Sequence, residues 1–255
     1  MKAQQPLEKI NWSKVHNQFI EQAKPFKKLS SAIVANGPIA LDSPKEKDMV
    51  AEMDAVAKVL EKYPRFNQRL FYTLWNSPRI CTFDEISANT VVARRSDSGE
   101  EVLLPLVLRR VNTLSVEEIQ SEIRRYKTAP MAEIQAAGQV QRVSKLPRWL
   151  IRLLHWKFRS DPEFTISKVG TYGVSALPHH GSGGVSTFTP TTQTAFFPTS
   201  IQDQVVAIDG KPVVRTMLLC SVTADHYVVD GLDVQRMGLE LKRLVEDPSL
   251  LLGDA

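Results

Sequence analysis

Cysteine is scarce in this chain of 255 residues, which contains Cys81 and Cys220 alone. Each lies in an apolar run and neither belongs to a C-x-x-C pair, so we expect buried, reduced thiols and no disulfide or cysteine metal site. The sequence has no apolar run of membrane-spanning length, and residues 1–10 are polar, without the apolar core of a signal peptide. These absences predict a cytoplasmic protein with no membrane span.

The chain has no large excess of charge of either sign. The 32 basic residues stand against 28 acidic ones, which gives a net charge of +4. No basic run is interleaved with aromatic residues, so we expect no nucleic-acid partner. A hydrophobic content of 43% and a charged content of 24% are ordinary for a soluble globular protein. The length suits one large domain or two small ones, and no internal repeat is present.

The most informative segment is Thr223–Gly231. The apolar residues 217–222 before it predict a buried strand, and the spacing in 232–246 after it predicts an amphipathic helix. Within the segment, His226 stands four residues before Asp230. Histidine titrates near neutral pH, so it can take a proton from a nucleophile and return it. The alternative interpretation is a strand–turn–helix junction with a buried, hydrogen-bonded histidine.

The N-terminal half predicts one helix, then strands, then a second helix. The first helix begins at Ser43–Pro44 and ends before Pro64, because apolar residues recur there at helical spacing. Ser115 and Glu118 form a capping box for the second helix. Between the helices, β-branched and apolar residues predict strands, with a turn at 96–99 between the last two. These strands are expected at 79–83, 86–95 and 102–110.

The second half begins with a basic, aromatic helix near 146–158. We expect it to lie on a membrane surface or to pack on the core or a neighbouring subunit. Residues 178–200 predict a mobile polar loop beside a substrate channel. Its adjacent His179 and His180 would point apart in an extended chain, so we expect no metal site. Strands are expected at 204–208 and 211–223, joined by a hairpin turn at Asp209-Gly210.

The pattern His-x-x-x-Asp-Gly, from His226 to Gly231, resembles the signature of the acyltransferase components of the 2-oxoacid dehydrogenase complexes. Chloramphenicol acetyltransferase is similar there and shares their fold. The family usually has an arginine where this chain has Tyr227. The Tyr-Pro-Arg-Phe-Asn run at 63–67 and the elements after it follow the order of the same catalytic domain. The resemblance covers roughly residues 50–127 and 165–248, and the helix near 146–158 resembles an insertion in short, stand-alone relatives.

This resemblance implies an α/β fold, a two-layer sandwich of a mixed sheet and covering helices, as in chloramphenicol acetyltransferase. It implies a trimer, or a multiple of three, with active sites between subunits. We expect one catalytic domain over 41–250, preceded by a segment, 1–40, of unassigned structure. The reaction would move an acyl group between coenzyme A and dihydrolipoamide or another acceptor, without a bound prosthetic group or metal. No lipoyl-type domain or Ala/Pro-rich linker is present, so a lipoyl-bearing protein would act in trans.

The resemblance also assigns roles to residues. His226 would be the general base, and Asp230 a structural carboxylate that holds the loop. A hydroxyl would stabilise the oxyanion, and two serines compete for that role. Ser167 lies in Phe-Thr-Ile-Ser-Lys-Val-Gly and Ser175 in Gly-Thr-Tyr-Gly-Val-Ser-Ala-Leu, and both runs resemble family patterns.

The resemblance favours Ser175, because it lies 51 residues before His226, nearer the family's usual separation than Ser167, which lies 59 before it. For either serine, the alternative is a strand hydroxyl that bonds to the backbone. A non-catalytic trimeric assembly protein that retains the fold is the alternative function. Tyr227 in the arginine position and the missing lipoyl domain favour that alternative.

Overall fold

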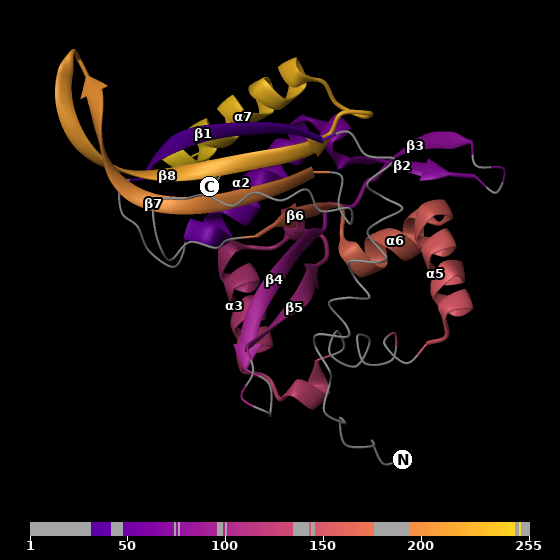
Figure 1. Ribbon diagram of the computed structural model, residues 1–255. Helices are drawn as coiled ribbons and strands as arrows, with labels where there is room; N and C mark the ends of the chain where they lie inside the picture. Colours follow the sequence, from indigo (N-terminus) through magenta and orange to yellow (C-terminus); the bar gives the residue numbers. More distant parts are fainter. Residues whose placement is uncertain are drawn as a thin grey trace.

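The computed structural model describes residues 32–41, 48–73, 77–95, 101–134, 146–175 and 194–247, together with the single residues 75, 99, 143 and 250. Among these residues, six strands form one mixed sheet in the order β1-β8-β7-β6-β4-β5 (Figure 1). A separate two-stranded sheet pairs β2 with β3. The six strands are β1 (Ala32–Leu41), β4 (Ala88–Arg95), β5 (Glu101–Leu108), β6 (Tyr172–Val174), β7 (Thr194–Ile208) and β8 (Lys211–Asp225).

The short central strand β6 gives the sheet its mixed character. It runs parallel to both of its neighbours, β4 and β7, whereas every other pair in the sheet is antiparallel. The small sheet consists of β2 (Gln68–Tyr72) and β3 (Pro78–Thr82). The helices are α2 (Asp48–Lys62), α3 (Val116–Thr128), α5 (Arg148–Ser160), α6 (Pro162–Val169) and α7 (Gly231–Glu246).

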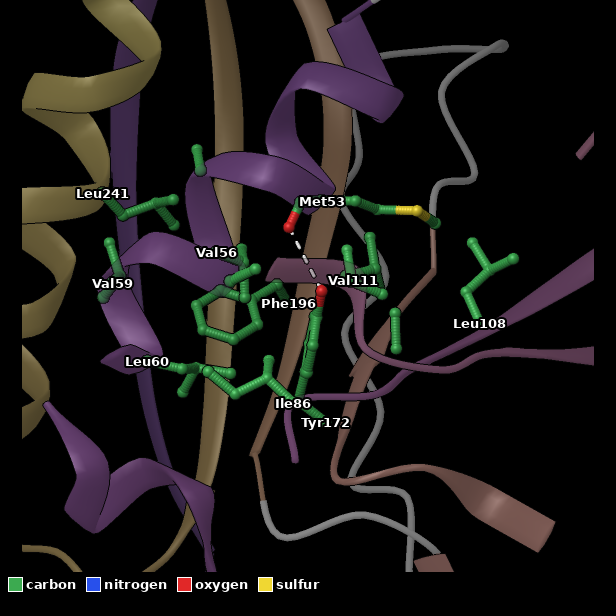
Figure 2. Packing of buried hydrophobic residues seen from close by; sticks show 14 of the residues in the cluster. Met53, Val56, Val59, Leu60, Ile86, Leu108, Val111, Tyr172, Phe196 and Leu241 are labelled. Atoms are coloured by element: carbon green, nitrogen blue, oxygen red, sulfur yellow. Dashed lines mark hydrogen bonds between the residues drawn. The ribbon is translucent and has the colours of Figure 1, made fainter. Parts of the chain in front are cut away.

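The core lies between the large sheet and three helices. Helix α2 packs against both α3 and α7, and these helices contact β4 and β1 respectively. Figure 2 shows Met53, Val56 and Leu60 of α2 facing Tyr172 and Phe196 of the central strands. The Tyr172 hydroxyl donates a hydrogen bond of 3.1 Å to the Met53 carbonyl oxygen, which satisfies its one polar atom inside the core. The expected sandwich of a mixed sheet and covering helices is therefore confirmed.

Several local predictions are confirmed. The apolar face of the first helix is buried at Met53, Val56 and Leu60, although Ser43 and Pro44 lie outside the described residues. The capping box is complete, because Glu118 N donates to Ser115 Oγ (3.2 Å) and Ser115 N donates to Glu118 Oε2 (2.7 Å). Strands β3, β4 and β5 occupy the three predicted ranges with ends shifted by a few residues. Cys220 is buried, as predicted, whereas Cys81 is only half-buried.

One expectation about the chain's course is wrong, and one segment without an assigned structure contains a strand. The predicted loop 178–200 ends too late, because β7 begins at Thr194 and residues 194–200 are buried in the sheet. Its apolar run Ala195–Phe197 lies between β6 and β8, and the threonines around it concealed the strand. Residues 178–193, with His179 and His180, lie outside the described residues. The segment 1–40, left without structure, contributes most of β1 at the sheet edge.

Strand β1 pairs antiparallel with β8, from Ala32 opposite Asp225 to Leu41 opposite Thr216. Its asparagine, glycine and proline obscured it in the sequence. An edge strand tolerates a proline because one of its sides lacks a ladder partner.

Strands β7 and β8 form a long hairpin that extends beyond the rest of the sheet. Asp209 and Gly210 at its tip have φ angles of 51° and 75°, as in the type I′ turn that the Asp-Gly pair predicts. Figure 1 shows this tip curling away from the body of the molecule. Val205 and Val214 pair across the two strands and are 70% and 65% exposed. None of the described helices has the length and apolarity needed to cross a membrane.

Candidate active site

His226 is the first residue after β8 and begins a tight turn. The amide groups of Val228 and Val229 donate to the Asp225 carbonyl oxygen at 3.0 and 3.2 Å, which closes the turn. The His226 ring is exposed, and its Nδ1 lies 3.0 Å from the Val229 carbonyl oxygen. The alternative of a buried histidine at this junction is therefore wrong.

The contact with Val229 determines which ring nitrogen can act as a base. A carbonyl oxygen only accepts hydrogen bonds, so in the neutral ring Nδ1 carries the hydrogen and donates it. The basic lone pair then stands on Nε2. A neutral histidine held in this tautomer and exposed to solvent can accept a proton from a nucleophile that approaches Nε2.

Asp230 is the N-cap of α7. Its Oδ1 accepts a hydrogen bond of 2.9 Å from Asp233 N, which satisfies one of the free amide groups of the first turn. Hydrogen bonds from the backbone of Asp233 and Leu232 hold the pKa of the Asp230 carboxyl below its usual value. This geometry suits a carboxylate that fixes the start of the helix, and therefore the end of the His226 loop.

Arg65 also holds this loop, a role that the sequence did not predict. It lies in the 3₁₀ turn Pro64–Asn67 that follows α2. Its Nη1 donates to Asp233 Oδ2 at 2.6 Å, and its Nη2 donates to the Val228 carbonyl oxygen at 3.3 Å. The guanidinium therefore joins α7 to the turn next to the carbonyl that bonds His226. In the sequence, Arg65 belongs to the Tyr-Pro-Arg-Phe-Asn run that resembles the family. Only the fold shows which groups the arginine contacts.

A second arginine lies behind the turn. Burial lowers the pKa of the Arg69 guanidinium on β2 to about 10, and the nearby Asp225 carboxylate acts in the opposite direction. Asp225 is itself buried, and its Oδ1 accepts a hydrogen bond of 3.0 Å from Tyr227 N. The buried Asp225 carboxylate, with the Arg69 guanidinium nearby, thus holds the backbone of Tyr227, so both neighbours of His226 are fixed.

The two candidate serines occupy different kinds of structure. Ser167 lies in helix α6, is exposed, and donates from Oγ to the Phe164 carbonyl oxygen at 2.8 Å. The alternative for Ser167, a strand hydroxyl that bonds to the backbone, is right about the backbone bond and wrong about the strand. Ser175 directly follows β6, is half-buried, and donates from its backbone N to the Phe196 carbonyl oxygen at 3.0 Å.

The sheet register separates Ser175 from His226. Val174 lies opposite Phe196 on β7, and the next β7 residue, Phe197, lies opposite Ser221 on β8. Ser175 thus stands level with Ser221, five residues before His226. Five residues of extended strand span about 16 Å. One chain therefore brings His226 together with Asp230 but holds Ser175 well beyond hydrogen-bonding reach of the ring.

The position of Ser175 depends on a close contact between β4 and the start of β6. Thr171 N donates to the Ser87 carbonyl oxygen at 2.7 Å, and Ser87 N donates to Thr171 Oγ1 at 3.0 Å. Gly170, with a φ of +65°, approaches so closely that a Cβ there would lie 2.6 Å from the Ser87 carbonyl oxygen. Only glycine fits this approach, so the Gly-Thr pair sets where β6 begins.

Within the described residues, no group of three or more histidine, cysteine, aspartate or glutamate side chains could hold a metal ion.

Comparisons with known proteins find similar acyltransferases. The family described as 2-oxoacid dehydrogenases acyltransferase (catalytic domain) matches residues 159–253. The human mitochondrial dihydrolipoyllysine-residue succinyltransferase component of the 2-oxoglutarate dehydrogenase complex is 34% identical over 91 residues, which are 36% of this chain and 18% of the relative. The corresponding component of Bartonella vinsonii subsp. berkhoffii is 24% identical over 209 residues, 78% of this chain and 40% of the relative. The chain thus spans less than half the length of these relatives.

Solved structures match nearly the whole chain. The cubic core of the pyruvate dehydrogenase multienzyme complex superposes with a TM-score of 0.67 at 15% identity, covering 98% of this chain and 100% of the other. A probable dihydrolipoamide acetyltransferase from Listeria monocytogenes gives 0.64 at 16% identity, covering 96% of each chain. A chloramphenicol acetyltransferase gives 0.50 at 12% identity, covering 95% of this chain and 98% of the other.

From residue 159 onward the sequence therefore resembles the catalytic domain of the 2-oxoacid dehydrogenase acyltransferases, and the chain as a whole has their chloramphenicol acetyltransferase-like fold.

Proposed function

We propose that this chain is an acyltransferase that moves an acyl group between coenzyme A and a thiol acceptor such as dihydrolipoamide. The observation that carries the proposal is the His226 ring, exposed and held in one neutral tautomer by Val229 at the end of β8. The matched family and relatives are acyltransferases, which supports the same reaction class. No metal takes part in this proposal.

The proposed reaction needs one general base and one hydroxyl group that stabilises the oxyanion. Nε2 of His226 removes the proton from the attacking thiol, and the thiolate adds to the thioester carbonyl carbon. The negative charge that develops on the carbonyl oxygen accepts a hydrogen bond from a serine hydroxyl, for which we propose Ser175. The tetrahedral intermediate then expels the second thiolate, which takes the proton back from the imidazolium. No covalent intermediate on the protein is required.

A related dihydrolipoamide acetyltransferase supports this choice of serine. In the enzyme of Azotobacter vinelandii, a serine, a histidine and an asparagine have been investigated for their role in the catalytic mechanism. The serine there precedes the histidine by 52 residues, and the asparagine follows it by four. In this chain, Ser175 precedes His226 by 51 residues, and Asp230 follows it by four. Ser167, at 59 residues, fits less well.

We propose that a second copy of the chain supplies the serine hydroxyl. His226 and Ser175 of one chain are too far apart to share a substrate carbonyl, which supports a site formed between subunits of a trimer or a multiple of three. The exposed β7–β8 hairpin supports such an assembly. A two-stranded ribbon is marginally stable alone, and Val205 and Val214 near its tip are exposed.

The acceptor and the compartment follow from the same chemistry. A lipoyl group carried by a separate protein, acting in trans, would present the dihydrolipoamide thiol. A reducing compartment such as the cytoplasm keeps that thiol, and Cys81 and Cys220, in the reduced form.

A turnover assay tests the proposal. Acetyl-, propionyl- and succinyl-coenzyme A are offered in turn to the chain with free dihydrolipoamide, and release of coenzyme A is measured, with His226→Gln as the inactive control. Turnover by the wild type that the control lacks is the expected result. An assembled trimer that transfers none of these acyl groups would contradict the proposal and favour the non-catalytic assembly protein.

A further inference from the structure

The solvent face of α5 carries an apolar stripe. Trp149, Leu153 and Trp156 are 68%, 52% and 44% exposed. Their spacings of four and three residues place them on one side of the helix. No residue of α5 is buried, so this stripe is not the core-facing side of the helix.

The opposite side of α5 attaches the helix to the body of the protein. The Phe158 and Phe164 rings pack edge to face with centroids 5.0 Å apart, which joins α5 to α6. The Arg159 guanidinium lies over the Tyr72 ring of β2, 4.5 Å from its centroid. These contacts hold α5 in one orientation, and the stripe points away from the core.

Basic residues flank the stripe. Arg148 and Arg152, four residues apart, are exposed along one edge, and Lys157 is exposed along the other. No acidic residue occurs between 146 and 160. The first acidic residue after the helix in the sequence is Asp161, and its Oδ2 lies 3.9 Å from Lys157 Nζ. The Lys157 ammonium also lies over the Phe164 ring of α6, 4.5 Å from its centroid. The face is therefore apolar along its middle and cationic along the edge of Arg148 and Arg152, and that edge is complementary to a negatively charged surface.

The neighbouring β2–β3 hairpin adds to this corner of the molecule. Arg79 of β3 donates to the Ser160 carbonyl oxygen at the end of α5, at 3.2 Å. Trp75, between the two strands, is 90% exposed, and Ile80 is half exposed. Figure 1 shows the hairpin and α5 at the end of the molecule opposite the tip of β7–β8. Large apolar side chains thus protrude from two separate elements.

We propose that this face of α5 docks on an anionic lipid membrane. Tryptophan prefers the membrane–water interface, where its ring is buried and its N–H remains hydrated. Arginine and lysine at the edges of a helix reach the lipid phosphates while their methylene stems cover apolar surface. A fluid lipid surface accepts protruding side chains from two elements, whereas a folded protein would need a matching hollow for each. This docking adds to the proposed acyl transfer and does not depend on it.

Vesicle binding tests the proposal with the full chain. Sedimentation with vesicles of phosphatidylcholine alone is compared with vesicles of phosphatidylcholine and phosphatidylglycerol in equal parts. We expect binding only to the anionic vesicles, weakened by salt. Each basic side chain near such a surface contributes about a fivefold gain in affinity, so the double variant R148Q/R152Q should bind roughly 30-fold more weakly.

Two further variants make the outcome decisive. W149A/W156A should lose most of the binding, whereas L239A, which removes an exposed leucine from α7, should bind like the wild type. If W149A/W156A does not fold, vesicle binding by R148Q/R152Q tests the proposal by itself. Both arginines are exposed, so their replacement should leave the fold intact. Three results would overturn the proposal: no binding to anionic vesicles at low salt, unchanged binding by R148Q/R152Q, or dissociation of an oligomer by W149A/W156A in the absence of lipid. The last would show that the face packs against a second copy of the chain.

Discussion

Ser175 and His226 lie on one continuous sheet, yet the register of β7 and β8 places them five residues apart along the strand direction. That separation of about 16 Å exceeds the reach of a serine hydroxyl to the oxygen of a carbonyl group that a thiolate at the histidine attacks. The two groups can serve one reaction only if they come from different chains.

Replacement of His226 by alanine should lower acyl transfer by about 10²–10⁴-fold, the range typical of a positioned general base. The ring is exposed and its hydrogen bond to Val229 lies within its own loop, so the thermal unfolding temperature should change little. Steady-state turnover and thermal unfolding of the same preparation check both points. A folded variant with the wild-type rate would remove the proposed mechanism.

Mixing two inactive variants should restore activity if the site is shared between chains. His226→Ala and Ser175→Ala are each purified, unfolded together and refolded, and the activity of the mixture is compared with each variant alone. Mixed trimers contain sites in which the intact histidine faces the intact serine. Ser167→Ala serves as the control and should be nearly fully active, since its hydroxyl bonds within α6. Absence of rescue in mixed trimers would place both groups on one chain.

Replacement of Arg65 by glutamine should reduce kcat with little effect on KM. The guanidinium fixes Val228 and Asp233, next to the carbonyl that orients His226, and misplacement of a reacting group by about 1 Å can cost 10²-fold in rate. Arg65→Lys should recover only part of the loss, because an ammonium lacks the planar fork that joins two acceptors. Arg243→Gln is the matched control, because Arg243 lies on α7 in an exposed ion pair with Glu240. Equal kinetic effects of Arg65→Gln and Arg243→Gln would argue against a positioning role.

Replacement of Gly170 by alanine should destabilise the protein by at least about 1–3 kcal/mol, the usual cost of a strained backbone position. The new Cβ would meet the Ser87 carbonyl oxygen at 2.6 Å, and the φ of +65° is itself unfavourable for alanine. Chemical denaturation measures the change. Gly238→Ala, where nothing lies within 4 Å of the added Cβ, is the control and should not destabilise. Equal stabilities of the two variants would contradict the close approach of β4 and β6.

Glu85 should make stability depend on pH in the acid range. Hydrogen bonds from Arg109 lower the pKa of the Glu85 carboxyl in the folded state below its ordinary value of 4.5. Stability from this group is therefore present above pH 4.5 and is lost as the pH falls through the lower, folded pKa. Chemical denaturation across this range should show a shallower loss for Glu85→Gln than for the wild type. Identical slopes would show that the pair with Arg109 does not persist in solution.

Features decided by short stretches of chain could be predicted from the sequence. Ser115 and Glu118 cap a helix because they are three residues apart, and Asp209-Gly210 turns a hairpin because both residues adopt positive φ. The strand, His226 and the helix that begins after Asp230 follow from one local pattern.

Tertiary structure decided what depends on distant segments. Ala32–Leu41 forms a strand because its backbone pairs with β8. Thr194–Ser200 forms one because β6 and β8 lie on either side of it. Arg65 reaches Val228 across 163 positions of sequence. The separation of Ser175 from His226 likewise arises from strand order and register, which backbone preferences of a few residues do not encode. The sequence alone therefore determined which groups are proposed to carry the chemistry, and the packing of the sheet decided that one chain does not bring them together.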